Sequence, residues 1–171
     1  MATDTGTRTT VPTIRPVVVL VCVCLGLFIA QVDTSAINLA LPAMNHDLSG
    51  GLSGMQWAVD AYNVAFAALL LTGGTVGDRF GRRRMFRLGL ATFVIGSVVC
   101  AVAPSLAVVL TGRVVQGVGA AMIMPQTLAI LTLTFTEKRA RNRAMAAWSA
   151  VAGIGLAVGP TLGGLLVDDI G

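Results

Sequence analysis

Long apolar runs alternate with short polar segments along this chain, and five of the runs are long enough to cross a membrane. Because a helix rises about 1.5 Å per residue, about 20 apolar residues cover the hydrocarbon core of a bilayer. We therefore predict five membrane-spanning helices, near residues 16–44, 57–76, 85–103, 106–133 and 144–167. A polar tail at residues 1–15 precedes them. The expected fold is an all-α integral membrane bundle over residues 16–171.

Composition supports a membrane protein and gives no sign of an enzyme. Apolar residues make up 55% of the 171 residues and charged residues only 12%, whereas soluble domains average about 25% charged. The three cysteines lie inside apolar runs, and His46 is the only histidine. We find no nucleophile–base set, metal-ligand cluster or phosphate-binding loop in the sequence. We therefore expect no enzymatic activity, no cofactor and no metal.

The basic residues are unevenly distributed, and their distribution predicts the topology. Eleven of the twelve lie in the N-terminal tail or after the second and fourth spans, and the twelfth is Arg113. Residues 45–56 and 104–105, which follow the first and third spans, contain no Lys or Arg. By the positive-inside rule the N-terminus is cytoplasmic and the fifth span ends outside. The net charge of +4 therefore reflects topology and calls for no nucleic-acid partner.

The segment GTVGDRFGRRR, Gly74–Arg84, follows the second span and carries an acid among arginines. Positive charge alone would not require Asp78 or the glycines on either side of it. Gly74 is expected to permit close helix contact and Gly81 a tight reversal of the chain. Asp78 could bind nearby arginines or cap another helix, where the dipole favours an anion. A solvated surface salt bridge is the alternative.

Two charged residues of opposite sign are expected at the same depth in different spans. Asp33 lies about ten residues from the outer end of the first span, and Arg113 about eight from the outer end of the fourth, so both are roughly 12–15 Å deep. A lone charge there costs at least about 2.5–3.5 kcal/mol. The two form either a pair or parts of one aqueous path, and both are candidates for proton coupling. The alternative is a static ion pair that holds the two helices together. The third candidate, Asp60, lies near the end of its span, where it could instead be an interfacial acid.

Two further patterns concern helix faces. Gln31, Ser35 and Asn38 form a polar stripe on the first span, which could line a cavity or supply hydrogen bonds between helices. In the fifth span small residues recur every four positions, with a proline beside the middle one. This ladder predicts close packing against another helix and a bend. Its residues are Gly155, Gly159, Pro160, Gly163 and Gly164.

Taken together, these segments resemble motifs of drug:proton antiporters of the major facilitator superfamily, fourteen-helix branch. Gly74–Arg84 is similar to the loop signature between helices two and three, and RVVQGVGAA, Arg113–Ala121, to the helix-four motif. GLAVGPTLGG, Gly155–Gly164, resembles the antiporter motif, and VDTSAINLALP, Val32–Pro42, the branch's helix-one motif. The loop residues concerned are Gly74, Gly77, Asp78, Arg79, Gly81, Arg82 and Arg83, and the helix-four residues are Arg113, Gln116 and Gly117.

The resemblance implies proton-coupled export of amphiphilic organic compounds or drugs across the cell membrane, by alternating access between two six-helix halves. On this view the chain supplies five helices of a six-helix N-terminal half. Its partners would be a small-molecule substrate, protons, the lipid bilayer and the missing C-terminal helices. The alternatives are a dedicated efflux pump for one metabolite and a truncated membrane fragment that transports nothing. The five spans therefore lead us to expect a fragment or truncated product.

Overall fold

The computed structural model describes the backbone of residues 16–48 and 51–170, and the side chains of residues 16–37 and 51–158. This part of the chain forms five helices and no strand. The helices are α1 (Pro16–Leu48), α2 (Gly51–Phe80), α3 (Arg82–Ala101), α4 (Leu106–Thr134) and α5 (Lys138–Ile170). Each contains one of the five predicted spans or coincides with most of it.

The connections are shorter than the sequence indicated, because helix continues into the polar segments. Gly81 alone separates α2 from α3, with a φ of 97° that a residue bearing a Cβ would rarely adopt. Its N–H donates to the carbonyl of Gly77 at 3.0 Å, and its own carbonyl accepts from the N–H of Met85. The predicted reversal at Gly81 is therefore confirmed, and the charged residues around it are helical.

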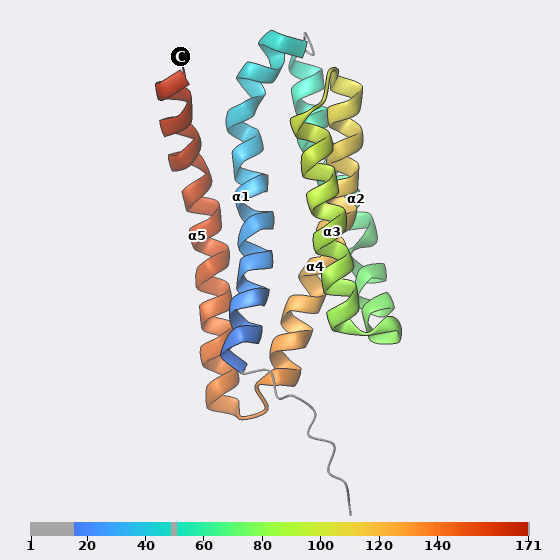
Figure 1. The fold of residues 1–171 in the computed structure, drawn as a ribbon, viewed down its shortest axis with the longest axis vertical. Coiled ribbons are helices and arrows are strands. Elements are labelled where there is room, and N and C mark those ends of the chain that lie inside the picture. The colour runs from blue at the N-terminus through green and yellow to red at the C-terminus, as the bar shows by residue number, and fades with distance from the viewer. Residues whose placement is uncertain (1–15, 49–50, 171) are drawn as a thin grey trace, which may run out of the picture.

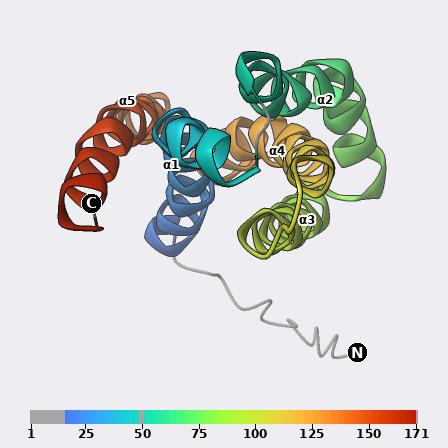
Figure 2. The ribbon, with the colours of Figure 1, turned by 90° about the horizontal axis from the view of Figure 1, so that it is seen from above.

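The bundle is organised around α4, which packs along α3 and α2 and, less extensively, along α1. The fifth helix, α5, packs mainly on α1. Seen from above, α1 and α5 lie on one side of α4, while α2 and α3 lie on the other (Figure 2). The long helices run side by side along one axis (Figure 1).

Glycines allow α4 to approach its neighbours closely. A Cβ placed on Gly117 would lie 2.5 Å from the carbonyl oxygen of Tyr62 in α2, a distance that real Cβ atoms do not show. On the other side, a Cβ on Gly119 would lie 2.7 Å from the amide nitrogen of Phe93 in α3. Small residues at such contacts are typical of helices that associate within membranes, where van der Waals packing drives association.

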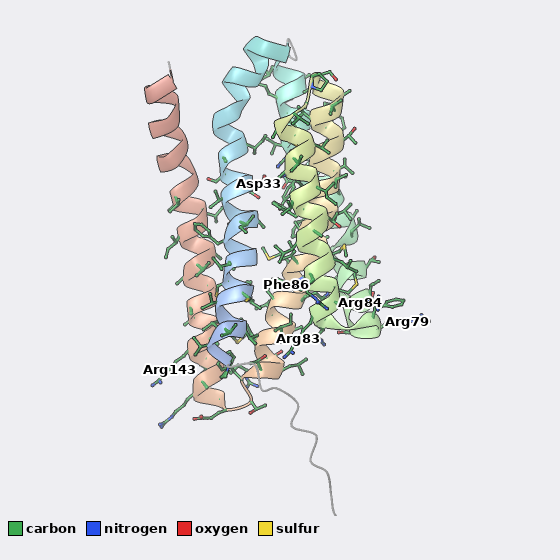
Figure 3. All side chains as sticks on the ribbon, viewed as in Figure 1. Asp33, Arg79, Arg83, Arg84, Phe86 and Arg143 are labelled. Atoms are coloured by element: carbon green, nitrogen blue, oxygen red, sulfur yellow. The ribbon has the colours of Figure 1, made fainter. Side chains whose placement is uncertain are left out.

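Four helices have a described segment long and apolar enough to cross a membrane: Pro16–Ile37, Gly51–Phe80, Arg82–Ala101 and Leu106–Thr134. The fifth predicted span remains a prediction, because its side chains are described only to residue 158. The labelled arginines Arg79, Arg83, Arg84 and Arg143 gather at one end of the bundle, where α2 meets α3 and α4 meets α5 (Figure 3). This clustering agrees with the predicted cytoplasmic side.

The close contact at Gly117 generates the first prediction. Gly117→Ala should lower the stability of the protein by about 1–3 kcal/mol, because the added methyl group has no space beside the backbone of Tyr62. Gly153→Ala is the matched control, since a Cβ there meets nothing within 4 Å and alanine favours a helix. Thermal unfolding in detergent measures both variants. Equal midpoints would contradict the proposed close packing of α2 and α4.

Candidate functional site

The two charges expected at one depth meet in the structure. The Nη1 atom of Arg113 in α4 lies 2.6 Å from the Oδ2 atom of Asp33 in α1. Arg113 is almost fully buried, with 2% of its side chain exposed, while 22% of the Asp33 side chain is exposed. Asp33 lies in the middle part of α1, between that helix and α4 (Figure 3). The pair therefore keeps its cation inside the bundle and leaves part of its carboxylate uncovered by the described helices.

The guanidinium of Arg113 has three further partners, and all of them are uncharged. Its Nε atom donates to the backbone carbonyl of Ala58 in α2 at 3.0 Å. Its Nη1 atom also donates to the Oε1 atom of Gln116 at 3.0 Å. The guanidinium carbon lies 4.5 Å from the ring centroid of Tyr62, within the range of a cation–π interaction. The planar group therefore donates from two separate nitrogen atoms and also lies over an aromatic ring, a combination that a single ammonium nitrogen cannot provide.

Gln116 connects the ion pair to a third helix. Its Nε2 atom donates to the Oδ1 atom of Asp33 at 2.6 Å and to the hydroxyl oxygen of Ser97 in α3 at 2.9 Å. Only 1% of Gln116 is exposed. Both oxygens of Asp33 are thus occupied, one by Arg113 and one by Gln116. The cluster of Asp33, Arg113, Gln116 and Ser97, called here the buried polar cluster, joins α1, α3 and α4.

This arrangement can accommodate a change of charge at Asp33. If a proton neutralises the carboxylate, Arg113 loses its counterion but keeps the Ala58 carbonyl, the Gln116 amide oxygen and the Tyr62 ring. Hydrogen bonds to charged groups contribute about 1.5–3 kcal/mol each, so these neutral partners lessen the penalty of an unpaired cation. Of the two side chains, that of Asp33 is the more exposed, at 22% against 2% for Arg113.

A second site lies at the junction of α2 and α3. Asp78, near the end of α2, pairs at 2.7 Å with Arg82, the first residue of α3, and both side chains are accessible, at 61% and 35% exposed. The neighbouring Arg79 guanidinium carbon lies 5.7 Å from the Phe80 ring centroid. The contact seen in this conformation is therefore the exposed salt bridge, and the switch role of the loop stays a prediction.

The glycines before Asp78 pack against α4. A Cβ on Gly77 would collide with the side-chain amide of Gln126, whose Nε2 atom donates to the carbonyl of Gly73 at 2.8 Å. A Cβ on Gly73 would collide with the carbonyl oxygen of Ala121. A Cβ on Gly74, by contrast, would make an ordinary contact of 3.7 Å with Pro125. The close contact expected of Gly74 is therefore made by Gly73 and Gly77.

The polar stripe of α1 faces α5. The Oγ atom of Ser35 donates to the carbonyl of Leu156 at 3.1 Å, and the Nε2 atom of Gln31 to the carbonyl of Ala152 at 3.5 Å. Gly155 lies against Gln31, where an added Cβ would be 2.7 Å from the Gln31 Cβ atom. Both stripe residues thus supply hydrogen bonds between helices, and their role in lining a cavity stays a prediction.

Several predicted residues lie apart from these contacts. Asp60 is exposed on α2 and lines a shallow depression with Leu52, Met55, Gln56 and Val59, so the structure does not bring it to the buried polar cluster. The remaining members of the stripe and of the glycine ladder lie outside the described side chains. They are Asn38, Gly159, Pro160, Gly163 and Gly164.

Three partners of the cluster were missed by the sequence analysis. Tyr62 is the only tyrosine of the chain and lies within an apolar run, a signal that could have drawn attention to it. Ser97 could also have been noticed, as a hydroxyl residue inside the third span. Its position in the sequence, however, gave no indication that it accepts a hydrogen bond from Gln116. The Ala58 contribution is a backbone oxygen, which has no signature in sequence.

A bundle of long apolar helices with a buried acid–arginine pair is typical of a protein that crosses the membrane several times. The chain belongs to the Major Facilitator Superfamily, whose family model matches residues 23–171. It is therefore a multi-pass protein of the cell membrane, in a family of transporters rather than a class of enzymes. The expected all-α major-facilitator-type bundle is confirmed.

Curated relatives carry names of drug and antibiotic resistance. The chain is 41% identical over 150 residues to the methylenomycin A resistance protein of Bacillus subtilis (strain 168), covering 88% of this chain and 32% of that protein. It is 41% identical over 152 residues to the multidrug resistance protein Stp of Mycobacterium tuberculosis (strain CDC 1551 / Oshkosh), covering 89% and 28%. The drug efflux pump JefA of the same strain is 44% identical over 147 residues, covering 86% and 29%. The chain thus spans about 30% of the length of these relatives.

The contacts of Arg113 generate the second prediction. Arg113→Lys should reduce stability by about 1.5–3 kcal/mol, because an ammonium facing Asp33 cannot also donate through Nε to the Ala58 carbonyl. Arg84→Lys, an exposed position, is the control and should change little. Thermal unfolding in detergent, at matched expression, compares the two. A Lys variant at position 113 as stable as wild type would mean that charge alone matters there.

Proposed function

We propose that this protein exports amphiphilic organic compounds, such as drugs or antibiotics, in exchange for protons. The proposal rests on membership of the family and on relatives named for drug efflux and antibiotic resistance. Residues 16–171 form part of an N-terminal bundle in this proposal, after a cytoplasmic tail at residues 1–15. Transport by alternating access then requires further helices, as the greater length of the relatives suggests.

The observation that carries the proton-coupling step is the ion pair of Asp33 and Arg113 between α1 and α4. Exchange needs a group that holds a proton in one state and releases it in another. Asp33 is such a group in this proposal, because it is half-enclosed, touches the buried cation, and leaves Arg113 with neutral partners when it is protonated. An approaching cationic substrate or a movement of α1 would change which partner Asp33 prefers.

Two substrate ranges are compatible with this proposal. A broad range is favoured by relatives named as multidrug resistance proteins, and a narrow one by relatives named for a single compound, such as the tetracenomycin C resistance and export protein of Streptomyces glaucescens. We place the broad range first and the dedicated pump second. Efflux of a panel of chemically unrelated antibiotics by cells that express the full-length protein separates the two.

The ion pair gives the third prediction. In the full-length transporter, Asp33→Asn should abolish proton-driven export, because an amide holds no exchangeable charge for Arg113 to balance. The measurement is substrate movement in everted vesicles under an imposed pH gradient, with the amount of inserted protein determined in the same vesicles. Export at the wild-type rate would remove Asp33 from the coupling step.

Asp60→Asn is the comparison arm, because it makes the same chemical change at an exposed acid outside the buried polar cluster. Loss of coupling in Asp33→Asn with export retained in Asp60→Asn supports the assignment to the ion pair. The reverse result transfers the coupling role to Asp60. Loss in both variants would indicate that two acids are required.

The fourth prediction concerns the Asp78 site. We propose that Asp78 stabilises one of two transport states through charges at the cytoplasmic end of the bundle, of which Arg82 is the partner in this conformation. Asp78→Asn should shift the balance between states and cut transport strongly, while substrate binding survives. Labelling of single cysteines on each membrane face, with the three native cysteines replaced, measures the balance.

Glu137→Gln is the matched control, because it also removes one exposed acid at the basic end of the bundle. This variant should leave both labelling and transport near wild type. If Asp78→Asn behaves in the same way, the salt bridge with Arg82 is a surface contact worth about 0–1 kcal/mol and has no switching role.

A further inference from the structure

A groove between α1 and α3 lies beside the α2–α3 junction and shares Arg83 with the loop motif there. Its volume is about 670 Å³, within the range of about 300–1,000 Å³ that is usual for small-molecule sites. Its floor includes Phe86 of α3, which is buried, and Ile130 of α4. Its α1 wall is apolar and includes Val18, Leu25 and Ile29, each of which is 44–54% exposed.

The groove has charge at one end only. Arg83 and Arg87 line it, one helical turn apart on α3, and no acidic residue lines it. Neither arginine pairs with an acid within residues 16–37 and 51–158, and both are exposed. Like charges at this spacing repel each other, so an anion between the two guanidinium groups would relieve the repulsion.

The dimensions of the groove match one leaflet of a bilayer. From Val18 to Ile29 the α1 wall rises about 16 Å, and half of a hydrocarbon core is about 15 Å thick. The arginines lie at the end of the bundle where the basic residues gather, the predicted cytoplasmic side (Figure 3). A molecule that fills the groove therefore has a negative head at the membrane surface and an apolar body about one acyl chain long.

We propose that this groove binds an anionic phospholipid of the cytoplasmic leaflet. The headgroup phosphate lies between Arg83 and Arg87, where each planar guanidinium can donate two hydrogen bonds to phosphate oxygens. One acyl chain runs along Val18, Leu25 and Ile29 of α1 towards the middle of the membrane. Basic pockets between membrane helices on the cytoplasmic side are known to bind anionic lipid headgroups.

A lipid at this position would contact two helices, because its head binds α3 and its chain lies along α1. The proposal does not rest on the exported substrate or on proton coupling. It can fail while the transport proposal stands, and the converse also holds. The competing occupant is another helix of the protein packed into the same groove, which would leave no room for lipid.

The test is native mass spectrometry of the full-length protein in detergent, with phosphatidylglycerol and phosphatidylcholine of identical acyl chains. Wild type should bind phosphatidylglycerol preferentially. The double variant Arg83→Gln/Arg87→Gln should bind it roughly 25-fold more weakly, since each basic residue near anionic lipid contributes about a fivefold factor. Arg83→Lys/Arg87→Lys should retain most of the preference, which also shows that the site tolerates substitution without unfolding.

The matched control is Arg79→Gln/Arg84→Gln, which removes the same charge from two exposed arginines that do not line the groove. It should keep the wild-type preference. Equal loss in the two Gln variants would overturn the proposal, because the preference would then come from diffuse positive charge. An absence of headgroup preference would overturn it too, as expected if a helix fills the groove. Displacement of the lipid by equimolar glycerol phosphate would also overturn it, since the acyl chain would then contribute nothing.

Discussion

The structure depends on one constraint, which is that a guanidinium buried in a membrane bundle must be surrounded by acceptors. Arg113 is 2% exposed and takes these from three helices: a carboxylate from α1, a carbonyl from α2 and an amide from its own helix. Removing one partner of a buried ion pair costs about 3–5 kcal/mol, because the other charge is left uncompensated. The position of α4 among α1, α2 and α3 meets this requirement and also buries apolar side chains such as Ile123 and Leu131.

Glycines make that central position sterically possible. Gly117 faces α2 and Gly119 faces α3, so two neighbours approach the α4 backbone from different sides. The polar residues Arg113 and Gln116, which precede these glycines on α4, can then reach partners on those neighbouring helices directly. Small and polar residues therefore act together on α4: the former set the distance between helices and the latter fix which atoms meet across it.

Much of the fold, and the centre of the candidate site, could be predicted from sequence. The helices follow from apolar runs of bilayer length, and Asp33 and Arg113 from the cost of a charge in lipid together with equal depth. The extent of helix beyond the spans could not be predicted, since polar residues such as Asp78 and Arg82 are compatible with helix as well as loop. The contact of Arg113 with the Ala58 carbonyl could not be predicted either, nor that Gly73 and Gly77, and not Gly74, pack closely against α4. Both depend on the rotation of α2 about its own axis.

The helices fall into two groups, α1 with α5 and α4 with α2 and α3. Only one member of the buried polar cluster, Asp33, belongs to the first group. Asp33 therefore links the two groups of helices within a single bundle. Its two carboxylate oxygens accept hydrogen bonds from Arg113 and Gln116, which both belong to α4. Neutralising the carboxylate would weaken this contact between α1 and α4, whereas the hydrogen bond from Gln116 to Ser97 still joins α4 to α3. In the proposed exchange, a proton on Asp33 would therefore weaken the contact of α1 with α4, while α1 stays packed on α5.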